Sequence, residues 1–60
     1  MRRVIVRDPQ HAKELGIWFH QEPRAWPVEV FDDGTFYDAI GDGVHGEWSG
    51  DVEDEEWEEW

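Results

Sequence analysis

Short runs of apolar residues, separated by residues typical of turns and helix caps, cover the first fifty positions of the chain. Residues Met1–Arg7 predict a first strand, because three consecutive β-branched residues stand at its centre. Asp8 and Pro9 mark a helix start, since aspartate caps a first turn and proline needs no N–H donor there. The helix is expected over Gln10–Leu15, and Gly16 stands where a left-handed C-terminal cap belongs.

Later stretches show the apolar clustering and alternation of strands. Ile17–His20 is a short apolar run, and Ala25–Phe31 alternates between two faces. Asp32-Asp33-Gly34 predicts a hairpin turn, because Asp-Gly is favoured where both central turn residues have positive φ. Thr35–Ile40 is then the returning strand and Val44–Trp48 the last. The expected fold class is α+β, a small antiparallel meander of three to four strands with one short helix and an acidic C-terminal tail.

The length of 60 residues allows one small domain, expected over residues 1–50 and followed by a tail over residues 51–60. In the tail, Trp57 and Trp60 would share one face of a helix with Glu53, and a disordered tail is the alternative. The absence of cysteine excludes disulfides and thiolate metal ligands. No apolar run is long enough to span a membrane, so a cytoplasmic location is expected. A core this small rarely supplies more than about 3–5 kcal/mol, which favours a homodimer.

Charge is segregated along the chain. All five cations lie within the first 24 residues, among three of the sixteen acidic residues. The other thirteen carboxylates lie between Ala25 and Trp60 with no lysine or arginine, and the formal net charge is −11. Solubility of a small domain needs a net charge of magnitude about 2–8 only. The excess predicts attraction to a cationic partner and repulsion of nucleic acid and anionic membranes.

The density of this charge resembles that of a DNA duplex. B-DNA carries one negative charge per about 1.7 Å of its axis, so thirteen carboxylates correspond to about 22 Å of duplex. A globule of 60 residues should have a radius of gyration of about 10 Å and a diameter near 27 Å. The two charge densities are therefore similar over the length of the protein itself.

Five tryptophans indicate a folded body, because each large ring can bury about 150–250 Å². Trp18 and Trp26 lie in apolar stretches and are expected in the core. Trp48, Trp57 and Trp60 stand among acidic residues and are expected to contact a dimer partner or a target. Docking of these three rings onto the core of their own chain is the alternative.

Catalysis and metal binding find little support in the residue pattern. Asp38, Asp42 and Gly43 resemble a calcium loop, but their spacing departs from the EF-hand pattern and turn chemistry accounts for them. The three histidines lack paired ligand spacing, and Ser49, the only serine, lacks the signature of an activated nucleophile. We expect no enzyme activity, no metal and no cofactor.

In charge, size and aromatic content, the segment Trp26–Trp60 resembles the phage-encoded DNA-mimic proteins, small acidic folds that occupy the nucleic-acid cleft of a host enzyme. Members of that group inhibit restriction enzymes, CRISPR effectors, histone-like proteins, gyrase or uracil-DNA glycosylase, and they share no fold or motif. The resemblance implies an inhibitor in the host cytoplasm that competes with DNA for a basic cleft and binds neither DNA nor a membrane itself. The expected partner-binding residues are Asp32, Asp33, Asp38, Asp42, Glu47, Trp48, Asp51, Glu53, Asp54, Glu55, Glu56, Trp57, Glu58, Glu59 and Trp60.

Other functions remain open at this stage. An acidic adaptor or an antitoxin would cover a basic partner without competing with DNA. A small inhibitor of RNA polymerase would bind outside the DNA channel. Mutual exclusion of DNA and this protein on the target distinguishes mimicry from these alternatives.

Overall fold

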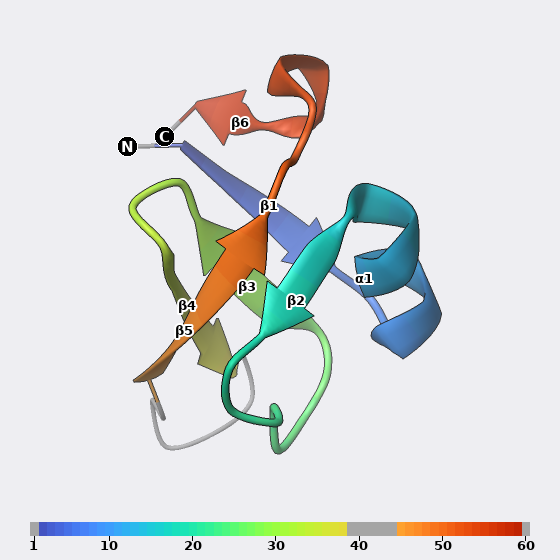
Figure 1. Cartoon of the computed structure of the whole chain (residues 1–60), viewed down its shortest axis with the longest axis vertical. Coiled ribbons are helices and arrows are strands. Elements are labelled where there is room, and N and C mark those ends of the chain that lie inside the picture. The colour runs from blue at the N-terminus through green and yellow to red at the C-terminus, as the bar shows by residue number, and fades with distance from the viewer. Residues whose placement is uncertain (1, 39–44, 60) are drawn as a thin grey trace.

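The computed structural model describes residues 2–38 and 45–59 of the chain (Figure 1). Within these ranges the chain forms one six-stranded antiparallel sheet, in the order β2-β5-β4-β3-β1-β6, and one α-helix. In chain order the elements are β1 (Arg2–Val6), α1 (Pro9–Leu15), β2 (Ile17–Phe19), β3 (Val28–Phe31), β4 (Thr35–Asp38), β5 (His45–Gly50), the 3₁₀ turn η1 (Asp54–Glu56) and β6 (Glu58–Glu59).

The expectation of three to four strands was wrong, because two short segments complete the edges of the sheet. At one edge β2 pairs with β5, and at the other edge β6 pairs with β1. Glutamate has a low strand propensity, so nothing local predicts β6. Its register sets Arg2 opposite Glu59 and Arg3 opposite Glu58, and opposite charges on neighbouring strands stabilise the pairing.

A meander accounts for only the middle of the sheet. The strands β3, β4 and β5 follow one another and pair in sequence order. The first two strands lie apart, since β1 pairs with β3 whereas β2 pairs with β5. Helix α1 makes this possible by carrying the chain from the end of β1 to the start of β2 (Figure 1).

Both helix caps predicted from the sequence are confirmed. The side chain of Asp8 accepts a hydrogen bond from the backbone N of His11 at 2.8 Å, and Pro9 is the first helical residue. Gly16 ends the helix in the left-handed conformation with φ 81°, where its N–H donates to the carbonyl oxygen of Lys13. The chain then enters β2 directly.

Two strands have boundaries that differ from those expected from the sequence. β3 begins at Val28, later than expected, directly after Pro27, which has no N–H to donate. β5 continues beyond its expected end to Gly50. Two expected residues at the end of β4 and Val44 before β5 lie outside the described residues.

The β3–β4 turn differs from the expected two-residue turn with positive φ at both positions. Among the described residues only glycines have positive φ. In this turn Gly34 is the single residue with positive φ, at 93°. Its N–H donates to the carbonyl oxygen of Phe31 at 3.2 Å. The carboxylate of Asp33 accepts hydrogen bonds from the backbone N and hydroxyl of Thr35, at 3.1 and 2.6 Å. These bonds fix a three-residue loop with a left-handed glycine at its end.

The core lies between the sheet and α1. Its buried residues are Val4, Val6, Ala12, Ile17, Val28, Val30 and Phe36, and Trp26, as expected, packs against them while partly buried. The prediction that Trp18 is in the core was wrong, because its side chain is 75% exposed. Side chains alternate along β2, so the burial of Ile17 and partial burial of Phe19 point Trp18 outward.

Of the two alternatives left open by the sequence, an ordered tail and a disordered one, the structure has the ordered tail, although no α-helix brings Trp57 beside Glu53. Residues 51–53 are irregular, η1 makes a single turn, and β6 then pairs with β1. Val52 and Trp57 pack against the core. The radius of gyration is 10.2 Å, close to the expected value. None of the helices in the described ranges is long and apolar enough to cross a membrane.

Candidate functional site

Two segments that are distant in sequence meet at the guanidinium group of Arg2. Its Nε donates to Asp32 Oδ2 at 3.2 Å, and its Nη1 lies 3.6 Å from Asp54 Oδ1. Asp32 belongs to the β3–β4 turn and Asp54 begins η1, so one cation holds the turn beside the tail. The hydrogen bond to Asp32, helped by the charge of Asp54, raises the pKa of Arg2 above its ordinary value.

The β3–β4 turn also contacts β5. The backbone N of Trp48 donates to Gly34 O at 3.0 Å, and its indole Nε1 donates to Phe31 O at 2.7 Å. Thr35 and Glu47 are register partners in the β4–β5 ladder, so the exposed Glu47 lies beside the turn. The turn, the middle of β5 and the tail therefore form one continuous region of the molecule.

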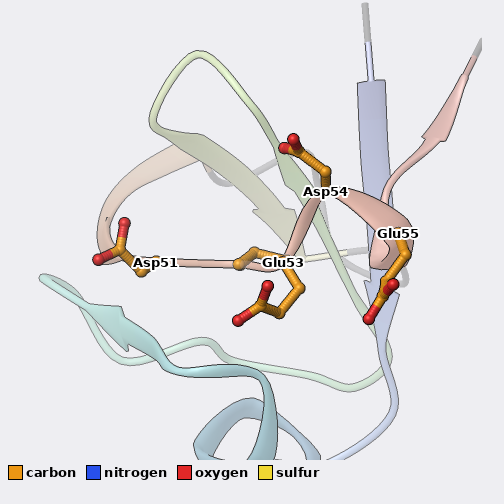
Figure 2. Close-up of a pocket in the computed structure, with 5 residues that line it drawn as sticks. Asp51, Glu53, Asp54 and Glu55 are labelled. Atoms are coloured by element: carbon orange, nitrogen blue, oxygen red, sulfur yellow. The ribbon is translucent and has the colours of Figure 1, made fainter.

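The tail carboxylates diverge from one another. Asp51, Glu53, Asp54 and Glu55 border a hollow of about 370 Å³. Figure 2 shows the carboxylates of Asp51 and Asp54 on one side of the ribbon and those of Glu53 and Glu55 on the other. Across the described ranges, no group of three or more histidine, aspartate or glutamate side chains could hold a metal ion. The arrangement displays charge outward on two sides.

We call this region the acidic surface. Its residues are all classed as exposed, and two of them, Asp32 and Asp54, form ion pairs with Arg2. Acidic side chains on an exposed surface are accessible to cationic groups of another molecule. The acidic surface comprises Asp32, Asp33, Glu47, Asp51, Glu53, Asp54, Glu55 and Glu56.

Asp38 was expected to contact a partner, and the structure contradicts this. Asp38 is the last residue of β4, and it is only 2% exposed. Its Oδ2 accepts a hydrogen bond from the backbone N of Arg24 at 2.9 Å, while Oδ1 is buried and has no hydrogen-bond partner among the residues that the structure describes. Asp38 therefore ties the segment before β3 to the sheet, and we remove it from the candidate surface.

The remaining expected acids lie elsewhere. Glu58 and Glu59 are exposed on β6, opposite the arginines of β1, so their charge is partly balanced across the ladder. Asp42 and Trp60 lie outside the described residues.

The rings of Trp48 and Trp57 contact each other, with centroids 5.9 Å apart. Both side chains are partly buried and pack against the core, and the guanidinium carbon of Arg2 lies 5.5 Å from the Trp57 ring centre. Docking onto their own chain, the alternative open from the sequence, accounts for these rings. Their contact with a partner stays a prediction.

Two side-chain contacts escaped the sequence analysis. Arg2 joins the turn to the tail, and its only local signal is its place at the start of a strand. The Nε2 of His20 lies 2.6 Å from Ser49 Oγ, on the neighbouring strand β5. Both residues are exposed, and no acidic side chain of the described chain hydrogen-bonds the His20 ring. The pair therefore lacks the third group that orients the base in a hydrolytic triad.

No family model, curated protein or solved structure matches this chain.

Proposed function

We propose that this protein is a DNA-mimic inhibitor that occupies the basic nucleic-acid-binding cleft of another protein. The observation that carries the proposal is the acidic surface, to which three contacting segments, the β3–β4 turn, β5 and the tail, contribute exposed acidic residues. Arg2 forms ion pairs with two members of this surface, Asp32 and Asp54. A partner that presents several arginines or lysines is its natural complement.

The dimensions support the same proposal. The longest extent of the described chain is 28 Å, over which B-DNA would carry about 16 phosphate charges. The protein carries a net charge of −11. Its mean charge density is thus about two thirds of that of a duplex, and its carboxylates are concentrated on part of the surface.

Docking of the tail supports binding through preorganisation. The carboxylates from Asp51 to Glu56 extend from a backbone that is anchored by Val52 and Trp57, which pack against the core. Charge-assisted hydrogen bonds to arginine and lysine are the stronger kind, and an anchored backbone loses less entropy when they form. A free acidic tail would lose more of its binding energy to ordering.

Competition with DNA tests the proposal. The immobilised protein should capture basic DNA-binding proteins from a lysate, and a fluorescent duplex bound to a purified captured protein should then be displaced. Displacement should follow simple competition, with excess duplex restoring the DNA complex. A stable ternary complex of target, duplex and this protein would overturn mimicry and favour an adaptor, an antitoxin or a polymerase inhibitor that binds outside the DNA channel.

Salt should weaken binding to the target. The residues of the acidic surface lie at the protein surface, so their attraction to a cation is screened when the Debye length shortens. We expect the affinity to fall by at least about tenfold between about 50 and 200 mM salt, less than the loss typical of DNA itself. Isothermal calorimetry at several salt concentrations measures this, and an affinity independent of salt would point to an apolar interface.

A further inference from the structure

The two edges of the sheet differ in charge. The edge strand β6 consists of Glu58 and Glu59, so a second copy approaching this edge would meet like charge. The edge strand β2 consists of Ile17, Trp18 and Phe19 and carries no charge. Charged residues protect an edge from pairing with another chain, and their absence leaves β2 as the open edge.

Backbone hydrogen-bonding groups of β2 point toward this open edge. The backbone N of His20 donates to Glu47 O at 2.9 Å, and Trp18 pairs with Ser49 in the same register. In an antiparallel ladder, alternate residues direct their N–H and C=O groups to opposite sides. Ile17 and Phe19 therefore direct theirs away from β5.

An apolar groove of about 370 Å³ lies beside β2. Ala12 of α1, the residues of β2, and Pro23 and Trp26 from the segment before β3 contribute to its walls. Trp18 also borders the groove and, at 75%, is the most exposed large apolar residue of the described chain. A strand edge, an apolar groove and an outward tryptophan thus occur together.

We propose that a second copy of this chain docks here, with its β2 antiparallel to the first β2 and a twofold axis passing beside Trp18. Ile17 of each copy then faces Phe19 of the other, and their outward N–H and C=O groups exchange hydrogen bonds. The two Trp18 residues form a pair without ladder hydrogen bonds, where side chains approach most closely. The interface is isologous, so it closes as a dimer.

Charge complementarity supports a second copy as the occupant. Lys13 precedes β2 and Glu22 follows it, and both border the groove. In an antiparallel pair, the segment before one strand lies beside the segment after the other, so Lys13 of each copy approaches Glu22 of its partner. Within the described chain neither residue has an ion-pair partner. This dimer does not depend on the identity of the target or on DNA mimicry.

Sedimentation equilibrium of the full chain and its variants tests the proposal. The wild-type chain should dimerise at micromolar concentration, and Trp18→Ala should raise the dimer dissociation constant by at least about 100-fold. Tyr37→Ala, at a 40% exposed aromatic residue on β4, is the matched control and should change it by less than about threefold. Circular dichroism would confirm that both variants are folded. A monomeric wild type, or equal loss in both variants, would overturn the proposal.

Charge exchange tests the orientation. Lys13→Glu and Glu22→Lys should each weaken the dimer, because like charges then meet across the axis. The double variant should restore the dimer dissociation constant to within about threefold of the wild-type value. If the free-energy changes of the two single variants simply add in the double variant, the antiparallel arrangement is overturned. Higher salt should strengthen the dimer by screening two net charges of −11, whereas it should weaken target binding, so the two proposals fail separately.

Discussion

A chain in which Gly50 is replaced by alanine should be unfolded at room temperature. Gly50 has φ 140°, which residues with a Cβ rarely adopt, and an added Cβ would lie 2.0 Å from the carbonyl oxygen of Gly16. The backbones of Gly16 and Gly50 cannot move apart independently, because Gly50 pairs with Ile17, the residue after Gly16, in the β2–β5 ladder. Strain and collision together should exceed the roughly 3–5 kcal/mol that so small a core supplies. Far-ultraviolet circular dichroism and tryptophan fluorescence measure the loss.

Gly34→Ala is the matched control. Gly34 also has positive φ, 93°, but an added Cβ would meet no atom within 4 Å. Only the backbone strain remains, about 1–2 kcal/mol, which should lower Tm by roughly 4–16 °C and leave the chain folded. Similar melting temperatures for the two variants would show that β2 and β5 tolerate a wider separation at Gly50.

Neutralising four tail carboxylates should weaken target binding about 1,000-fold and raise thermal stability. The variant Asp51→Asn, Glu53→Gln, Glu55→Gln, Glu56→Gln changes exposed side chains that have no ion-pair partner in the described chain. Each lost contact with a target cation should cost about 1 kcal/mol, which sums to roughly 4 kcal/mol. Removal of like charges also lowers self-repulsion of the folded state, so Tm should rise. Calorimetric titration of the captured target and a thermal melt measure both effects.

The control for this variant is Glu14→Gln, which removes an exposed carboxylate from α1 rather than from the acidic surface. Its target affinity should stay within about threefold of wild type, the effect of one distant exposed charge. If the fourfold variant also binds within threefold, the tail is not the mimic surface. Equal losses per charge in both variants would mean that only the net charge matters.

Local chemistry determined the parts of the fold that the sequence predicted correctly. The caps at Asp8 and Gly16 each depend on a few neighbouring residues, so the helix between them could be located. β6 could not, because two glutamates become a strand only when the arginines of β1 lie opposite them. The outward direction of Trp18 likewise depends on the register of β2 against β5.

The candidate site also has a part that the sequence predicted and a part that it did not. The excess of carboxylates was plain in the sequence, but their burial was not: Asp38 accepts a backbone hydrogen bond inside the fold, while Asp33 stands on an exposed turn. The sequence does not distinguish these two aspartates, since each comes shortly after the apolar residues of a strand. The role of Arg2 also required the fold, because its two carboxylate partners come from distant segments.

The pairing of β1 with β6 has a consequence for synthesis. Arg2 is made 57 residues before its register partner Glu59, an interval of about 3–11 s at about 5–20 residues per second. Until then the nascent chain exposes a strand edge with two arginines, and its first 24 residues carry more cations than acids. During this interval the cationic segment should attract the RNA of the ribosome weakly, and the carboxylates that are made later offset this attraction.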